Sequence, residues 1–118
     1  MISVCVRSSF SAAHRVEDHP GECRELHGHN YVVELCVSGE LNEMNMVMDF
    51  ADLKRVLRDV LKRLDHKFLN EVMGERNATV ELIALYLWRE VRKRIPKGLR
   101  LRRIRVFESE DQWAEIEE

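Results

Sequence analysis

The amino-acid sequence predicts an α+β fold whose antiparallel, four-stranded sheet is covered on one face by two helices. Segments with two-residue alternation of apolar and polar residues lie at both ends of the chain, and segments with three- and four-residue spacing lie between them. The resulting order is strand, strand, helix, helix, strand, strand. Strands grouped apart from helices in this way are typical of a single antiparallel layer with helices against it.

Four segments are predicted as strands. Residues 2–14 alternate through three aliphatic side chains, and residues 27–39 alternate through Tyr31 and the apolar residues that follow it. Between them, residues 15–25 are polar and contain a Pro-Gly pair, which is typical of a loop. Residues 99–109 form the third predicted strand and residues 112–118 a short fourth.

Two segments are predicted as helices. Leucine and valine recur at three and four residues from position 53 to position 64, with Asp49 as the expected N-cap. A short extended piece, residues 46–50, precedes this helix, and a long connection, residues 65–77, follows it. The second helix starts near Thr79 and ends before Pro96 and Gly98, because proline cannot continue a helix.

Length and composition favour one globular domain over residues 1–118. The sequence is 45% hydrophobic, which is enough for a core, and its net charge of -2 gives no general reason to expect nucleic-acid or membrane binding. It contains no apolar run long enough to cross a membrane, and its first residues lack the pattern of a signal peptide. We therefore expect a cytoplasmic protein.

The cysteines support the same expectation. There are three, an odd number, and their spacing is not that of a disulfide framework. Cys5 and Cys36 lie in predicted strands, so we expect both to be reduced and buried as small hydrophobic residues.

Three histidines form a candidate metal site. His27 and His29 are two residues apart in a strand, so their side chains leave the same face, and His14 ends the strand expected to pair with it. Three imidazoles would leave the fourth position of a Zn²⁺ ion open for catalysis, whereas addition of Cys23 would close a structural site. The local spacing leaves both possibilities open.

Two further groups are candidates for acid–base chemistry. Cys23 lies beside Arg24, whose positive charge would favour the thiolate, as would a nearby metal ion. Asp65 precedes His66 just past the first helix, where a carboxylate can orient an imidazole. The alternative for the second pair is an ordinary histidine at the end of a helix with a solvated aspartate.

Glu108 ends the third predicted strand, where its carboxylate could accept two N–H bonds from a flat heterocycle or simply face solvent. Nine basic residues lie between Arg89 and Arg105. Three interpretations of this basic cluster are open: a solvated surface, a surface that attracts a phosphorylated substrate, and an RNA-binding surface. RNA binding is disfavoured because no aromatic residue lies among these arginines to stack on bases, and Phe107 stands just beyond them.

Taken together, these segments resemble the superfamily of 6-pyruvoyl-tetrahydropterin and 6-carboxytetrahydropterin synthases. The resemblance covers nearly the whole chain, in six motifs that occur in the family's order. They are FSAAH ending at His14, CRELHGHNY from Cys23, MVMDFADLK from Met46, LDHKFLN from Leu64, ATVELIALYLW from Ala78 and VFES from Val106. The three-residue interval between Cys23 and His27 is similar to the 6-carboxytetrahydropterin branch.

The resemblance implies a role for each candidate residue. It makes His14, His27 and His29 the ligands of Zn²⁺, and Cys23 the general base. Asp65 and His66 would complete the proton relay, Glu108 would anchor the pterin, and Thr79 and Glu81 would help to bind it. Ala78 and Leu82 depart from the residues that many members carry there, proline and asparagine, so pterin contacts near Leu82 are less firmly implied.

The implied fold is the tunnelling fold (T-fold), whose members assemble as trimers stacked into hexamers with sites at subunit interfaces. The implied reaction converts 7,8-dihydroneopterin triphosphate to 6-carboxy-5,6,7,8-tetrahydropterin, a precursor of the 7-deazaguanine bases queuosine and archaeosine. Three alternatives stay open: pyruvoyl product formation, side-chain cleavage to 6-hydroxymethyl-dihydropterin, and a non-enzymatic, zinc-stabilised interaction module.

Overall fold

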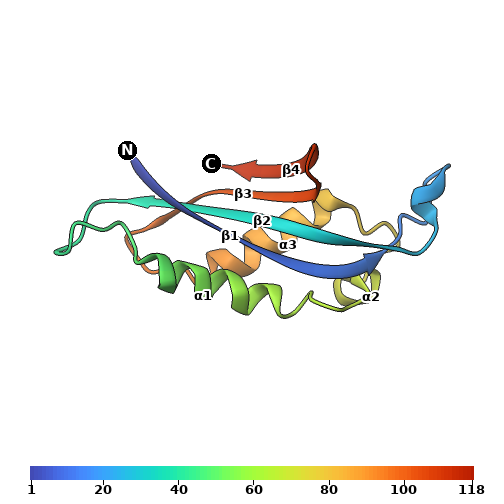
Figure 1. Cartoon of the computed structure of the whole chain (residues 1–118), viewed down its shortest axis with the longest axis horizontal. Helices are drawn as coiled ribbons and strands as arrows, with labels where there is room; N and C mark the ends of the chain where they lie inside the picture. Colours follow the sequence, from blue (N-terminus) through green and yellow to red (C-terminus); the bar gives the residue numbers. More distant parts are fainter.

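A computed structural model describes residues 1–118 as one antiparallel sheet with helices packed against one face (Figure 1). The strands are β1 (Ile2–His14), β2 (His27–Gly39), β3 (Arg100–Ser109) and β4 (Gln112–Glu117), in the spatial order β1-β2-β3-β4. The helices are α1 (Phe50–Leu61), α2 (Leu69–Met73) and α3 (Val80–Arg92), with a 3-10 turn, η1, at Glu22–Arg24. The α+β prediction and its four strands are confirmed.

Strands β1 and β2 pair without interruption from Ile2↔Gly39 to His14↔His27. The molecule is elongated, 52 Å by 23 Å by 21 Å, because these two strands are 13 residues long. The 15–26 connection, which contains η1, lies at one end of the molecule, and the connection from β2 to α1 lies at the other (Figure 1).

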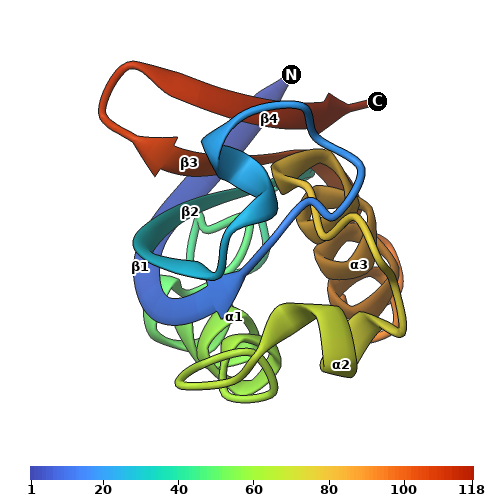
Figure 2. The same cartoon turned by 90° about the vertical axis from the view of Figure 1, so that its right-hand side faces the viewer.

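The core lies between the sheet and the helices, as the end-on view shows (Figure 2). Even-numbered residues of β1 and odd-numbered residues of β2 face it, because side chains alternate along a strand. The strands therefore contribute the buried side chains of Phe10, Tyr31 and Val33 to the core. Helices α1 and α3 contribute the buried Leu57 and Leu87. The opposite face of the sheet carries mostly polar and charged residues, together with the aromatic pair of Phe107 and Trp113.

The helices differ from prediction in their ends and number. Helix α1 begins as predicted, with the Asp49 carboxylate accepting a hydrogen bond from the Ala51 N–H at 2.7 Å, but it ends at Leu61 rather than near Leu64. Helix α3 ends at Arg92, three residues before Ile95. The predicted 65–77 connection contains the short helix α2, whose single turn is too short to show a periodic pattern. The predicted extended piece over residues 46–50 is not a strand: Val47 and Met48 form bends, and Phe50 begins α1.

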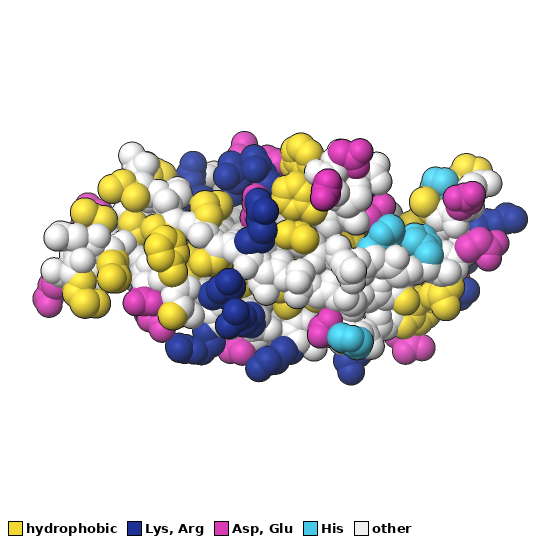
Figure 3. Space-filling model, in the orientation of Figure 1, with side chains coloured by type: hydrophobic (Ala, Val, Ile, Leu, Met, Phe, Trp, Pro, Cys, Tyr) yellow, Lys and Arg dark blue, Asp and Glu magenta, His cyan; other side chains and the backbone are white.

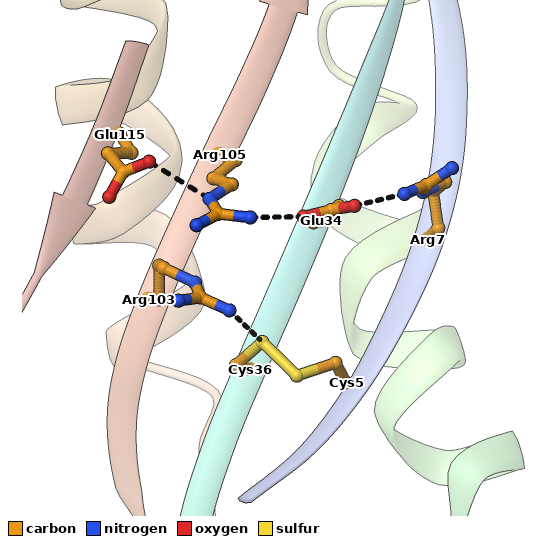
Figure 4. The surroundings of a disulfide bond; sticks show 7 residues. All are labelled: Cys5, Arg7, Glu34, Cys36, Arg103, Arg105 and Glu115. Atoms are coloured by element: carbon orange, nitrogen blue, oxygen red, sulfur yellow. Dashed lines mark hydrogen bonds and ion pairs between the residues drawn. A yellow bond between two sulfur atoms is a disulfide. The ribbon is translucent and has the colours of Figure 1, made fainter. Parts of the chain in front are cut away.

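The prediction that all cysteines are reduced is wrong for two of them. Cys5 and Cys36 face each other in the β1–β2 register and form a disulfide, with their Cα atoms 4.1 Å apart (Figure 4). Cys36 is buried as expected, whereas Cys5 is exposed on the face of the sheet away from the helices. Cys23 is the one free cysteine.

Candidate metal and pterin site

The three candidate histidines meet at one end of the sheet, on the face that the helices cover. His14 pairs with His27 across β1 and β2, and His29 follows two residues along β2. One ring nitrogen of each histidine lies within 4.8 Å of the corresponding nitrogens of the other two. In the space-filling view, histidine side chains gather toward this end of the molecule (Figure 3).

Backbone carbonyls orient two of these rings. The Nδ1 of His14 lies 2.7 Å from the carbonyl oxygen of Ala78, and the Nδ1 of His27 lies 2.6 Å from that of Glu25. A carbonyl only accepts hydrogen bonds, so each Nδ1 carries a proton, and in the neutral imidazole each Nε2 then holds a free lone pair. This is the arrangement by which proteins orient metal-binding histidines.

Two of the three rings have an Nε2 atom without a hydrogen bond in the chain. The Nε2 atoms of His14 and His29 are buried and make no hydrogen bond. Burial lowers the pKa of His14, and the nearby His27 and His29 lower it further, against the raising effects of the Ala78 carbonyl and Glu108. His14 therefore favours the neutral form, which is the form that binds a metal. Three converging imidazoles, two of them with a buried Nε2 that makes no hydrogen bond, suit Zn²⁺.

Cys23 is not a member of this group of ligand atoms. It lies in η1, half-buried, and its backbone carbonyl accepts a hydrogen bond from the Val16 N–H at 2.7 Å.

Asp65 and His66 form a pair docked on the outer edge of β1. The Asp65 carboxylate accepts a hydrogen bond from the Ser11 N–H at 2.9 Å and lies 3.0 Å from the Nδ1 of His66. These bonds, the one from Ser11 first, hold the pKa of Asp65 below its ordinary value. The His66 ring is exposed and lines a hollow of about 530 Å³ together with His29 and Asn30. Cys23 does not line this hollow.

Glu108 continues the helix-facing side of β3 and comes close to the histidines. One carboxylate oxygen lies 3.9 Å from the Nε2 of His29. Glu108 and Glu81 both line a second hollow, of about 440 Å³, between the start of α3 and strands β3 and β4. Thr79 lies at the same end of α3, where its hydroxyl accepts a hydrogen bond from the Leu82 N–H at 3.2 Å and caps the helix.

Tyr31 lies beneath the histidines and was not among the predicted site residues. Its ring centroid lies 5.4 Å from that of His29 and 5.8 Å from that of His14. Its position two residues after His29, on the same face of β2, is a signal that the sequence does contain. The backbone carbonyls of Glu25 and Ala78 were also missed, and no sequence pattern reveals them.

The predicted basic cluster is divided by the fold. Lys93 and Arg94 are paired with Glu90 on α3, while Arg105 lies on the outer face of the sheet between Glu34 and Glu115 (Figure 4). These basic side chains therefore do not form one continuous surface.

The comparisons with known proteins agree with this geometry. The family model for 6-pyruvoyl tetrahydropterin synthase matches residues 3–118. The chain belongs to that family. A protein from Archaeoglobus fulgidus named putative 6-carboxy-5,6,7,8-tetrahydropterin synthase is 46% identical over 94% of this chain and 91% of its own length.

Two further members of the family are informative. Dihydroneopterin monophosphate aldolase from Pyrococcus furiosus is 40% identical over 97% of this chain and 96% of its own. The structure of 6-pyruvoyl tetrahydropterin synthase from Caenorhabditis elegans matches with a TM-score of 0.86 at 27% identity, over 99% of this chain and 95% of that one. The T-fold prediction is confirmed by this likeness. None of the helices of this family member combines the length and apolar character that crossing a membrane requires.

Proposed function

We propose that this protein is a zinc-dependent enzyme that converts 7,8-dihydroneopterin triphosphate to 6-carboxy-5,6,7,8-tetrahydropterin, with loss of acetaldehyde and triphosphate. The observation that carries the proposal is the group of three converging imidazoles, two of which have buried Nε2 atoms without a hydrogen bond, in a chain of this family. The similarity to the protein named putative 6-carboxy-5,6,7,8-tetrahydropterin synthase supports the choice of product. The product would lead to the 7-deazaguanine bases queuosine and archaeosine.

His14, His27 and His29 would hold the ion. Zn²⁺ bound there would supply a Lewis acid for the adjacent side-chain oxygens of the pterin, which makes the attached protons more acidic. The fixed Nδ1 protons of His14 and His27 keep the two Nε2 lone pairs available for the ion.

The remaining predicted residues would either transfer protons or bind the pterin. The Cys23 thiolate would remove a proton from the substrate side chain, and His66, oriented by Asp65, would carry protons to and from the site. The Glu108 carboxylate would accept hydrogen bonds from the N–H groups of the pterin, in the hollow that it shares with Glu81. Thr79, whose hydroxyl oxygen accepts from the Leu82 N–H, would help to bind the pterin at the same end of α3.

We also propose that the enzyme is a homohexamer, a dimer of trimers, in the cytoplasm. In one chain, Cys23 lies outside both the histidine group and the hollow that His66 lines. Assembly at a subunit interface would allow a neighbouring copy to complete the relay. Disulfides are unusual inside cells except in hyperthermophiles. A cytoplasmic protein with the Cys5–Cys36 disulfide therefore favours a hyperthermophilic source organism.

The Cys23→Ala variant tests the assignment of the base. We expect kcat to fall by at least about 100-fold while one zinc per chain is retained, because the thiol moves protons and does not bind the metal. Zinc content by mass spectrometry and turnover by chromatography measure the two effects separately. Loss of zinc in this variant would instead favour a closed structural site and the interaction-module alternative.

Side-chain cleavage is the second candidate function, because a relative named dihydroneopterin monophosphate aldolase is 40% identical over nearly the whole chain. Cleavage between the two hydroxyl-bearing carbons would release 6-hydroxymethyl-dihydropterin and a two-carbon aldehyde that retains the phosphate. The zinc-loaded protein should be incubated with dihydroneopterin triphosphate and, separately, with the monophosphate.

Mass spectrometry of the released products distinguishes the candidates. Acetaldehyde with 6-carboxytetrahydropterin supports the proposal, whereas a phosphorylated glycolaldehyde supports cleavage. A pterin that retains all three side-chain carbons would indicate the pyruvoyl reaction. No turnover of either substrate, with zinc bound, would contradict all three enzymatic functions.

A further inference from the structure

Asn70 is hydrogen-bonded to Arg15, the residue after His14, and both its amide oxygen and its amide nitrogen have partners. It belongs to α2, and 9% of its surface is exposed. Its amide oxygen accepts from the Arg15 N–H at 2.9 Å. Its amide nitrogen donates to the carbonyl oxygens of Arg15 at 2.9 Å, Glu75 at 3.0 Å and Arg76 at 2.9 Å.

These bonds join two segments that are far apart in the sequence. Arg15 directly follows the candidate ligand His14 at the end of β1. Glu75 and Arg76 begin the connection from α2 to α3, which leads within two residues to Ala78. Asn70 therefore binds the residue beside His14 to the segment whose carbonyl orients the His14 ring.

The orientation of His14 depends on this junction. The His14 Nδ1 donates to the Ala78 carbonyl, so a shift of the 75–78 segment removes the group that keeps the proton on Nδ1. Without that acceptor, the proton can move to Nε2, where it would occupy the lone pair that a metal needs. The ring would also lose one of the contacts that set its rotation.

We propose that Asn70 is a positioning residue of the metal site, acting on His14 through the 75–78 segment. This inference rests on the proposed metal site. A nearly fully buried side-chain amide with partners on both of its polar atoms is a rigid connector, because one planar group holds both segments at once.

Backbone bonds hold the same segments together and allow the variants to fold. The Ala78 N–H donates to the Arg15 carbonyl at 3.2 Å, the Glu17 N–H donates to the Arg76 carbonyl at 3.2 Å, and Val16 forms an antiparallel bridge with Asn77. These backbone bonds would still join the two segments in the absence of Asn70. Loss of the Asn70 side chain should therefore change the position of His14 without unfolding the chain.

The test compares Asn70→Ala and Asn70→Asp with a matched control, Asn77→Ala. Aspartate keeps the oxygen that accepts from Arg15 and replaces the donating NH₂ with an oxygen that faces three carbonyls. Asn77 lies in the same connection, but its side chain bonds only to Asp18, at 3.0 Å and 2.9 Å, and not to Arg15 or Ala78. Circular dichroism and thermal melting establish that each variant is folded.

Two readouts are independent of catalysis. The first is the affinity for Zn²⁺, measured by competition with a chelator, which we expect to fall about 10- to 100-fold in both Asn70 variants. The second is the tautomer of His14 in the metal-free protein, measured by long-range ¹⁵N–¹H correlation. We expect a single Nδ1–H tautomer in the wild type and in Asn77→Ala, and a mixture in the Asn70 variants.

The outcomes separate this inference from the proposed metal site. If the wild type fails to bind Zn²⁺, the metal site is wrong, and the tautomer measurement still tests the effect of Asn70 on His14. If a folded Asn70 variant binds Zn²⁺ like the wild type and keeps the Nδ1–H tautomer, the inference is overturned. If Asn70→Ala does not fold, Asn70→Asp is tested in the same way. Unfolding of both shows a purely structural role and also overturns it.

Discussion

The Tyr31 hydroxyl is a buried polar group without a partner in the chain. The residue is fully buried, its hydroxyl makes no hydrogen bond, and its ring stacks on Phe10 at a centroid distance of 4.9 Å. Burial raises the pKa of the Tyr31 phenol, and the negative charge of Glu108 raises it further. The hydroxyl therefore stays protonated and stabilises the fold through no hydrogen bond within the chain.

We expect the Tyr31→Phe variant to be at least as stable as the wild type. Removing an unpaired buried hydroxyl relieves a desolvation cost of up to about 1–3 kcal/mol, while the ring still fills its space. Urea unfolding of the metal-free protein measures the difference in the free energy of unfolding. A clear loss of stability would show that the hydroxyl has a bonded partner.

The sequence predicts some of the site residues because their relation is local. His27 and His29 share a face by strand periodicity, and His14 follows from its place at the end of the neighbouring strand. The residues that orient them are not predictable in this way. Asn70 lies 55 residues from Arg15, and Ala78 lies 64 residues from His14, so their contacts exist only after the helices pack.

At the scale of the elements, the disulfide depends on strand register. The pairing of His14 with His27 brings Cys5 directly opposite Cys36, and both side chains leave the face away from the helices. The N–H of Ser11 points away from β2, so by two-residue alternation Cys5 occupies a non-hydrogen-bonded pair, where Cα atoms approach most closely. Cysteine count and spacing alone contain no information about register, which is why the sequence-based prediction failed.

We expect the disulfide to stabilise the β1–β2 pair. It closes a loop between residues 31 apart, so replacing both cysteines by serine should lower the free energy of unfolding by about 2–4 kcal/mol. Urea unfolding with and without reductant measures this. Cys23→Ser is the control, because it should respond to reductant as the wild type does; equal stability of the double variant and the oxidised wild type would contradict the expectation.

Glu90 connects α3 to Arg63, two residues past the end of α1. Its carboxylate accepts from Lys93 at 2.8 Å and from Arg63 at 2.6 Å. The bond from Lys93, together with the charges of Lys93 and Arg63, holds the pKa of Glu90 below its ordinary value, against the raising effect of burial.

A lowered carboxyl pKa stabilises the folded state above the unfolded pKa, and this contribution is lost as the pH falls through the folded pKa. We therefore expect Glu90→Gln to be less stable than the wild type at pH 7, by about 0.5–1 kcal/mol. The difference should shrink below pH 4.5, the ordinary value, and vanish in stronger acid. Urea unfolding across pH measures this, and a difference that is independent of pH would rule out the ionic origin.

At the scale of the whole molecule, the sheet has two open edges, which the proposed ring would pair. The outward N–H groups of Ser11 and Ala13 are used within the chain, by Asp65 and by the Lys67 carbonyl. By the same alternation, the N–H of Ser9 also points away from β2, but no loop of the chain covers it. Open edges of this kind invite pairing with another copy.

Proline at position 9 tests whether β1 pairs with another copy. Ser9→Pro removes an outward N–H and leaves the β1–β2 ladder intact, so we expect a folded protein that no longer forms hexamers. Ser8→Pro is the matched control, since it removes an inward N–H opposite Val33 and should unfold the chain. Analytical ultracentrifugation and circular dichroism report the two effects. A hexameric Ser9→Pro variant would place the interface elsewhere.

The charged side chains on the outer face of the sheet alternate in sign from one strand to the next (Figure 4). Arg7 on β1 pairs with Glu34 on β2, which lies 3.5 Å from Arg105 on β3, which in turn lies 2.9 Å from Glu115 on β4. The row thus begins with a cation at one border of the sheet and finishes with an anion at the other. If β1 of one copy paired with β4 of the next, the alternation of positive and negative side chains would continue across the contact. The row therefore favours a head-to-tail ring and disfavours contacts between two β1 edges or two β4 edges.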